Sequence, residues 1–154
     1  MLEIRLMKNE DLNRVLEIEN ESFHMKWQKK DFLYELNENP FSTIIVVAID
    51  DIVQGFLDFM ITFSSASISQ IAISEKYRNK GYGKKLLDEM MRIVRNKRSV
   101  DIITLEVREQ NISARKFYEK NGFRFICIKP NYYSNGDSAV YMCKEVNYGD
   151  NISD

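Results

Sequence analysis

The chain has 154 residues, of which 44% are hydrophobic and 29% are charged. This length suits one domain with its own core, and the composition is typical of a globular protein. The formal net charge of -1 excludes a global electrostatic attraction to nucleic acid or to an anionic membrane, so any basic function must be local. The single histidine, His24, excludes most histidine-based metal sites and argues against a Ser-His-Asp triad.

The N-terminal stretch MLEIRLMKNEDL is charged from its third residue and lacks the apolar segment of a signal peptide. The longest apolar run, Ile44 to Ile49, is too short to cross a membrane. We therefore expect a cytoplasmic protein. Cys127 and Cys143 lie in apolar stretches without a CxxC motif, so we expect buried thiols, although a disulfide between them stays open.

The first half of the chain alternates between the periods of strands and helices. The pattern predicts a strand, two helices and three further strands, over 2–7, 9–20, 29–37, 43–49, 52–63 and 67–73. Asn9 is a plausible N-cap of the first helix. Asp50 and Asp51 separate two β-rich stretches and predict the turn of a hairpin.

The second half continues the same mixture. An amphipathic helix should end near Lys97, and it is followed by a strand, a helix and two strands over 102–107, 111–121, 123–129 and 138–146. Asn111 suits the N-cap of the second of these helices, and Gly122 suits its left-handed C-terminal position. The order β-α-α-β-β-β-α-β-α-β-β predicts an α/β fold, with a mixed sheet and helices on both faces. The polar residues 148–154 should form a flexible tail.

The loop KYRNKGYGKK lies between a predicted strand and a predicted helix. It lacks the GxxxxGK[ST] spacing of a Walker A loop and the third glycine of a dinucleotide fingerprint. The pattern [Q/R]xxGx[G/A] fits residues 78–83. Its glycines allow a ligand to approach the main chain, and the following helix N-terminus favours an anion, so the loop predicts a pyrophosphate site. A tight turn with a solvated basic face is the structural alternative.

A strand and a helix behind this loop carry a second pair of candidates. Glu106 interrupts the apolar strand IITLEVR, where a carboxylate is costly unless it is paired or used. Tyr118 lies twelve residues later on the predicted helix, so a carboxylate base and a phenol acid could act together. The alternatives are a salt bridge from Glu106 to Arg108 or Lys116, and a core position for Tyr118 beside Phe117 and Phe123.

Three stretches together resemble a known family: QIAISEKYRNKGYGKKLL, LEVREQNISARKFYEKNGF and NYYSNGDSAVYM. They are similar to the GNAT superfamily of acetyl-CoA-dependent N-acetyltransferases, and more narrowly to the RimI-like and archaeal N-terminal protein acetyltransferases. The resemblance runs from about Glu3 to Val146. It implies one GNAT domain over 1–147, with a mixed, mostly antiparallel central sheet of six to seven strands and helices on both faces.

The resemblance also implies a set of site residues. The general base falls on Glu106 and the general acid on Tyr118. The acetyl-CoA positions fall on main-chain groups of the central strand, on the glycine loop, on an asparagine and on the same tyrosine: Ile71, Ala72, Ile73, Arg78, Asn79, Lys80, Gly81, Tyr82, Gly83, Lys84, Asn111 and Tyr118. A splay or bulge in the central strand would leave an N–H free for the thioester oxygen. The substrate positions fall on Phe23, Trp27, Tyr132 and Tyr133. Lys26 stands where RimI-like proteins often have proline.

The implied activity is direct transfer of acetyl from acetyl-CoA to the N-terminal α-amino group of a protein, either a ribosomal protein or nascent chains. The resemblance implies no metal, no binding of nucleic acid or membrane, and a monomer or weak homodimer. Three alternatives remain open at this point. They are acetylation of a lysine side chain or a small amine, a non-catalytic acetyl-CoA-binding subunit, and a nucleotide-binding module.

Overall fold

The computed structural model describes residues 1–23 and 26–148. His24, Met25 and most of the expected tail lie outside the described residues. Tyr148 is described, and its hydroxyl donates a hydrogen bond to the Val100 carbonyl at 2.9 Å. At least one residue of the expected tail, Tyr148, is therefore held against the domain. In the described part of the chain, no helix has the length and apolar character needed to cross a membrane.

The element order agrees with the predicted one. Over the described residues, the strands are β1 (Leu2–Leu6), β2 (Ser42–Ile49), β3 (Ile52–Thr62), β4 (Ser65–Ile73), β5 (Ile102–Arg108), β6 (Arg124–Lys129) and β7 (Ala139–Glu145). The α-helices are α1 (Leu12–Ser22), α2 (Lys29–Asn37), α3 (Tyr82–Lys97) and α4 (Ile112–Lys120), and two short 3-10 turns cover Asn9–Asp11 and Glu75–Tyr77. Strand and helix bounds differ from the predictions by a few residues at most, apart from the start of α1.

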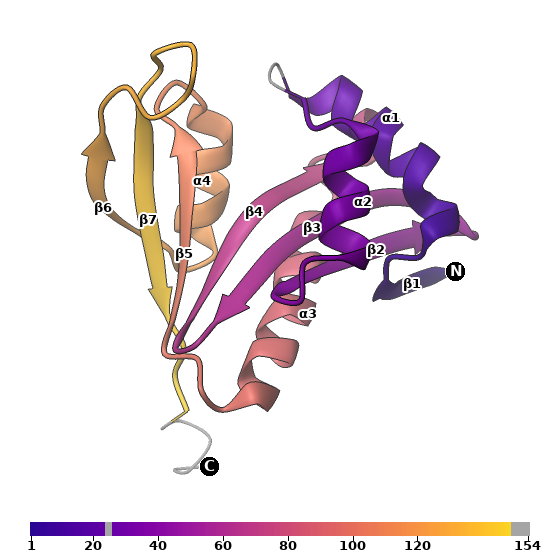
Figure 1. Cartoon of the computed structure of the whole chain (residues 1–154), viewed down its shortest axis with the longest axis horizontal. Coiled ribbons are helices and arrows are strands. Elements are labelled where there is room, and N and C mark those ends of the chain that lie inside the picture. The colour runs from indigo at the N-terminus through magenta and orange to yellow at the C-terminus, as the bar shows by residue number, and fades with distance from the viewer. Residues whose placement is uncertain (24–25, 149–154) are drawn as a thin grey trace.

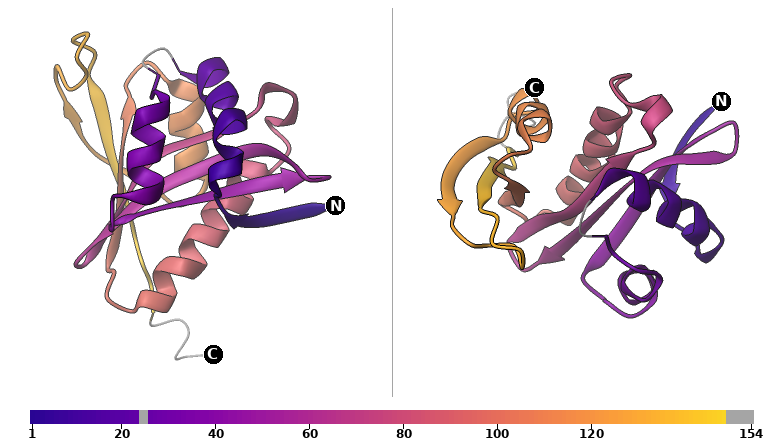
Figure 2. Two further views of the ribbon diagram at one scale, coloured as in Figure 1. Left: turned by 45° about the vertical axis from the view of Figure 1, so that its right-hand side comes forward. Right: turned by 90° about the horizontal axis from the view of Figure 1, so that it is seen from above.

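The seven strands form one sheet in the order β1-β2-β3-β4-β5-β7-β6. The β4–β5 pair is parallel and the other pairs are antiparallel, which confirms the mixed, mostly antiparallel sheet. Helices α1 and α2 cover one face, and α3 and α4 cover the other (Figures 1 and 2). Alternate residues of β2 show the two layers, because Ile44 and Val46 join the α1–α2 core whereas Ile45 and Val47 join the α3 core.

The start of α1 corrects one prediction. Asn9 does not cap the helix, because a 3-10 turn over Asn9–Asp11 precedes it. The Asp11 carboxylate instead accepts a hydrogen bond from the Lys8 N–H at 2.8 Å, and Arg5 holds that carboxylate with a contact of 2.7 Å. A side chain on β1 thus fixes the first turn, and an N-cap pattern along the chain cannot reveal such a tertiary partner.

The two parallel strands diverge at the centre of the sheet. Their ladder covers four pairs, from Ser65–Ile102 to Ile68–Leu105, and both strands continue beyond it. The ribbons of β4 and β5 visibly separate in Figure 1. At the same point β4 contains one extra residue, Ser69, between the β3 pairs Asp58–Gln70 and Phe59–Ile68. The strand therefore has both a splay and a bulge.

The cysteine prediction is wrong for one of the two thiols. Cys143 is buried in β7, but Cys127 is exposed in β6, and both are free. Strand β6 lies at the edge of the sheet, and its residues are mainly exposed, including the apolar Phe125, Ile126 and Ile128. An apolar sequence therefore predicted burial that the position of the strand does not provide.

Candidate active site

The glycine loop forms a left-handed turn directly before α3. Asn79 has φ 61° and Gly81 has φ 90°. The first helical hydrogen bond runs from the Lys85 N–H to the Gly81 carbonyl at 3.2 Å. The N–H groups of the three residues between them precede the helical ladder, at the positive end of the sixteen-residue helix α3. This arrangement suits an anion.

The two glycines of the loop are required for different structural reasons. A Cβ atom on Gly81 would meet nothing within 4 Å, so its requirement is conformational. A Cβ atom on Gly83 would lie 3.0 Å from the Phe117 ring, so this glycine allows α3 to approach α4 closely. Arg78 does not point freely into solvent, because its guanidinium donates to the Ile73 carbonyl at 2.9 Å and to the Ser22 hydroxyl at 3.1 Å. The side chain thereby ties the loop to β4 and to the end of α1.

Glu106 is partly buried and lies opposite Tyr141 in the β5–β7 ladder. Its carboxylate accepts hydrogen bonds from Lys129 Nζ at 2.9 Å and from the Tyr132 hydroxyl at 3.3 Å. The expected salt-bridge alternatives, Arg108 and Lys116, are not these partners. The carboxylate is thus paired, by a lysine that lies 23 residues away in the sequence.

Tyr118 lies on the other face of the sheet, in the α3 core. It is buried, with ring centroids 5.4 Å from Phe117 and 5.6 Å from Phe123. The core alternative is therefore correct as a description of its packing. Burial, and to a lesser extent the phenol of Tyr133, raise the pKa of Tyr118 above its ordinary value, so the phenol stays protonated at neutral pH.

Tyr132 and Tyr133 pack edge to face, with centroids 5.0 Å apart. Tyr133 is half-buried, and the Arg108 guanidinium lies 4.0 Å from its ring centroid. Arg108 also contacts the Asp137 carboxylate at 2.6 Å, while the Tyr133 N–H donates to the Asp137 carbonyl. The loop between β6 and β7 therefore holds both tyrosines near Glu106.

Asn111 has a local structural role. Its side-chain oxygen accepts a hydrogen bond from the Ala114 N–H at 3.1 Å, as expected for the N-cap of α4. The helix ends as predicted, with Gly122 at φ 93°.

A polar contact around the buried Glu19, on the α1 side of the sheet, was not predicted from the sequence. Glu19, on α1, is fully buried, and its Oε2 accepts hydrogen bonds from the Trp27 N–H at 2.8 Å and from Gln70 Nε2 at 2.9 Å. Gln70 directly follows the bulged Ser69. Glu19 thus connects the α1–α2 loop to the irregular part of β4. Its position among apolar residues of a helix was the available signal.

A second missed group lies beside this contact. Asp58 is fully buried on β3 and pairs with Gln70 in the β3–β4 register. Neither of its oxygens has a hydrogen-bond donor among the described residues. Burial, and to a lesser extent the neighbouring Glu35, raise the pKa of Asp58 to about 8, so its carboxyl group holds a proton at neutral pH. The aspartate within the apolar strand GFLDFMI was the sequence signal.

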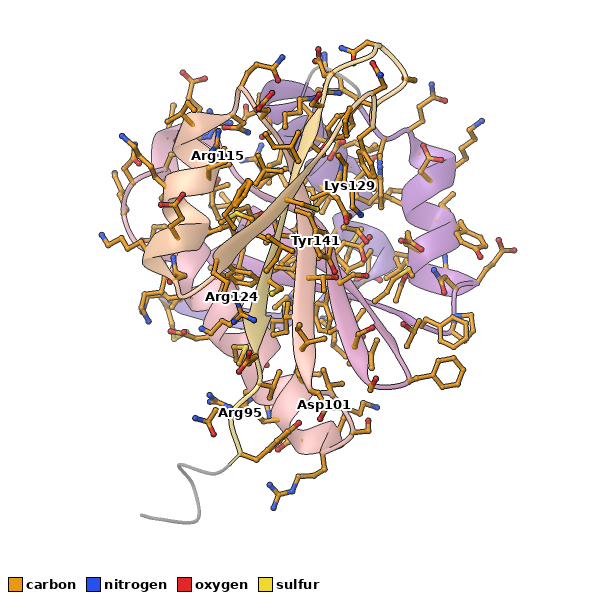
Figure 3. All side chains as sticks on the ribbon, turned by 90° about the vertical axis from the view of Figure 1, so that its left-hand side faces the viewer. Arg95, Asp101, Arg115, Arg124, Lys129 and Tyr141 are labelled. Carbon is orange, nitrogen blue, oxygen red and sulfur yellow. The ribbon has the colours of Figure 1, made fainter. Side chains whose placement is uncertain are left out.

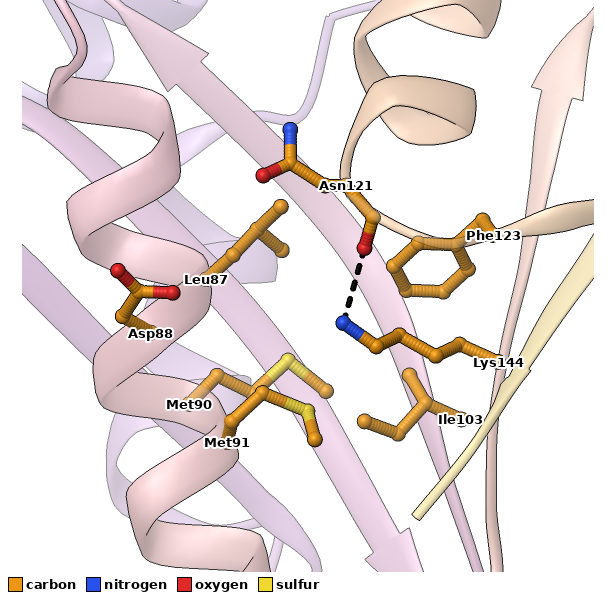
Figure 4. Close-up of a pocket in the computed structure, with 8 residues that line it drawn as sticks. All are labelled: Leu87, Asp88, Met90, Met91, Ile103, Asn121, Phe123 and Lys144. Carbon is orange, nitrogen blue, oxygen red and sulfur yellow. Dashed lines mark hydrogen bonds between the residues drawn. The ribbon is translucent and has the colours of Figure 1, made fainter. Parts of the chain in front are cut away.

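A small cavity is lined by none of the predicted site residues. Its volume of about 20 Å³ is enough for one water molecule, and it lies between α3 and the β5–β7 region (Figure 4). Lys144 lines it and donates to the Asn121 carbonyl at 2.9 Å. Within the described residues, no group of three or more His, Cys, Asp or Glu side chains is arranged to hold a metal ion.

The described chain therefore combines a splayed parallel strand pair, β4 and β5, with a left-handed glycine loop that leads from β4 into the N-terminus of α3. The sequence model of the acetyltransferase (GNAT) family matches residues 12–123. This chain belongs to that family.

Similar proteins agree with this assignment. A Bacillus subtilis protein, named as a candidate [ribosomal protein bS18]-alanine N-acetyltransferase, is 34% identical over 94% of this chain and 95% of its own length. An N-alpha-acetyltransferase of Saccharolobus solfataricus is 26% identical over 92% of this chain and 91% of its own. The crystal structure of the Escherichia coli ribosomal-protein-S18-alanine N-acetyltransferase superposes with a TM-score of 0.85 and 26% identity, and covers 97% of this chain and 96% of that one.

Proposed function

We propose that this chain transfers the acetyl group of acetyl-CoA to the N-terminal α-amino group of a protein, within one ternary complex. The observation that carries the proposal is the position of Glu106 at the splay. It directly follows Leu105, the last β5 residue that pairs with β4, and its carboxylate accepts a hydrogen bond from Tyr132, which packs against Tyr133. Relatives named as N-terminal acetyltransferases over nearly the whole chain support it. The name of the Bacillus subtilis relative favours a ribosomal protein as substrate, and nascent chains are the second candidate.

The acetyl-CoA site would lie across the splay. The main chain of Ile71, Ala72 and Ile73, beyond the end of the β4–β5 ladder, would hold the pantetheine arm. The N–H groups of the loop over 78–84 would hold the pyrophosphate. A main-chain N–H near the bulge would stabilise the oxyanion. Asn111 would lie near the coenzyme at the start of α4.

The two proposed catalytic groups lie on opposite faces of the sheet. Glu106 would accept a proton from the amine, directly or through one water, and Tyr118 would donate a proton to the departing thiolate. A protein α-amine has a pKa of about 7.7–8.0, compared with about 10.4 for lysine, so a carboxylate is a sufficient base. Phe23 and Trp27, with Tyr132 and Tyr133, would line the path of the substrate N-terminus.

Peptide acetylation tests this proposal. The purified protein is incubated with acetyl-CoA and with alanine-, serine- and methionine-initiated peptides that contain an internal lysine, each with a free or a blocked N-terminus. Mass spectrometry should locate one acetyl group on the free α-amine only. Acetylation of the lysine in both forms would instead favour a side-chain or small-amine acetyltransferase. Bound acetyl-CoA without any transfer would contradict the proposed activity.

A further inference from the structure

The amine of Lys129 lies directly against the proposed general base. Lys129 Nζ is 2.9 Å from Glu106 Oε2, 4.4 Å from the ring centroid of Tyr141 and 5.5 Å from that of Tyr132. A carboxylate and aromatic faces are the groups that proteins use to bind an ammonium ion. Lys129 therefore occupies, in the free protein, a position suited to a substrate amine.

The fold fixes the direction of this side chain. In the β6–β7 ladder Cys127 pairs with Tyr141, and in the β5–β7 ladder Tyr141 pairs with Glu106, so these three residues form one row across the sheet. Lys129 lies two residues beyond Cys127 and therefore on the same face. Pro130 follows it and favours an extended conformation at Lys129. Figure 3 views this side of the molecule and labels Lys129 and Tyr141.

An amine that a general base can deprotonate must lie within one hydrogen bond, or one bridging water, of that base. Lys129 Nζ already meets this condition. We propose that Lys129 is itself an acetyl acceptor, so that the protein acetylates its own Lys129 when no peptide is bound. The inference rests on the proposed function, because it uses the same acetyl donor and the same base.

The reaction balances without any further reactant. Glu106 accepts one proton from the Lys129 ammonium, and the freed lone pair forms a C–N bond with the thioester carbonyl carbon. The tetrahedral intermediate breaks its C–S bond, and the thiolate leaves and takes up a proton. Loss of the second nitrogen proton to solvent gives the amide. The products are N-acetyl-lysine, free coenzyme A and one proton.

Self-acetylation should be slow compared with peptide acetylation. The hydrogen bond to Glu106 and the nearby negative charge raise the pKa of Lys129, so the neutral amine is scarce at neutral pH. The product loses the positive charge, and with it the ion pair to Glu106 and the contacts with both tyrosine rings. A peptide amine would compete with Lys129 for the same base.

The experiment incubates the full-length protein with acetyl-CoA alone and follows each lysine by peptide-mapping mass spectrometry. The exposed Lys120, on the last turn of α4, is the internal control for chemical acetylation. We expect Lys129 to be modified at least tenfold faster than Lys120, with a first-order rate that does not depend on protein concentration. A saturating acceptor peptide should slow the modification. Glu106→Gln should reduce the Lys129 rate to that of Lys120, and Lys129→Arg should leave no acetyl group at this position.

Two outcomes would overturn the inference: an unmodified Lys129 in a protein that acetylates peptides, or modification at the same rate in Glu106→Gln. Peptide transfer is measured on the same samples, so the two proposals fail separately. If Lys129 is acetylated while every peptide remains unmodified, the self-acetylation inference stands and the proposed protein substrate does not.

Discussion

The Glu19 carboxylate accepts a hydrogen bond from the main-chain N–H of Trp27 at 2.8 Å, and this contact closes the α1–α2 loop against the sheet. The same oxygen accepts from Gln70, beside the bulge of β4. One buried side chain therefore holds the proposed peptide-binding loop against the strand that would hold the thioester.

We expect Glu19→Ala to raise the KM for peptide about tenfold while the affinity for acetyl-CoA stays within about twofold, because an unpaired buried donor costs about 1–3 kcal/mol on the peptide side of the site. Steady-state kinetics and acetyl-CoA titration measure the two effects. Glu19→Gln keeps an acceptor oxygen and should restore most of the peptide affinity. An equal loss of acetyl-CoA binding in Glu19→Ala would mean that Glu19 supports the whole domain instead.

Glu106→Gln should lower kcat for peptide acetylation by about 10²–10⁴-fold, because the amide cannot accept the proton of the attacking amine. The acetyl-CoA affinity should stay nearly unchanged, since the proposed coenzyme contacts lie elsewhere. Single-turnover kinetics with a free N-terminal peptide measure the chemical step. Full activity of this variant across the pH range would remove Glu106 from the mechanism.

Gly81→Val should weaken acetyl-CoA binding by at least tenfold, because φ 90° is strained for a β-branched residue and the loop must leave its present conformation. Gly136→Val is the matched control, with φ 92° and equally open space around its Cβ position. It disturbs the loop of Tyr132 and Tyr133, so it should affect the peptide KM and leave acetyl-CoA binding intact. Equal acetyl-CoA affinities of the two variants and the unmodified protein would refute the pyrophosphate assignment.

The stability of the protein should fall as the pH rises. The pKa of Asp58 is about 8 in the folded state, above its ordinary value of 3.8, so the folded state holds a proton that the unfolded state releases. This contribution is complete below about pH 4 and is lost as the pH rises through about 8, with a limiting slope of about 1.4 kcal/mol per pH unit. Urea unfolding between pH 6 and 9 measures it. Asp58→Asn should flatten the dependence, and an unchanged slope in that variant would assign it to other groups.

Local sequence determined most of the fold. Helical and strand periodicities depend on neighbouring residues, so they predicted every α-helix and strand of the described residues. They failed at Asn9, where Arg5 and Asp11 fix the first turn. The glycine loop was equally local, because a left-handed Gly81 before a helix needs no distant partner. Glu106 was identifiable because a carboxylate interrupts an apolar strand.

The partners of these residues depended on the tertiary structure. Lys129 on β6 reaches Glu106 on β5 because β7 lies between these two strands and pairs with both of them. The register of the two ladders places both side chains on the same face of the sheet. The same order places β6 at the edge, which exposes Cys127 in spite of its apolar neighbours. Gln70 on β4 lies between the two buried acids, because it pairs with Asp58 on β3 and donates a hydrogen bond to Glu19 on α1. Strand order and register are set by packing between distant segments, and periodicity along the chain contains no information on which strand lies beside which.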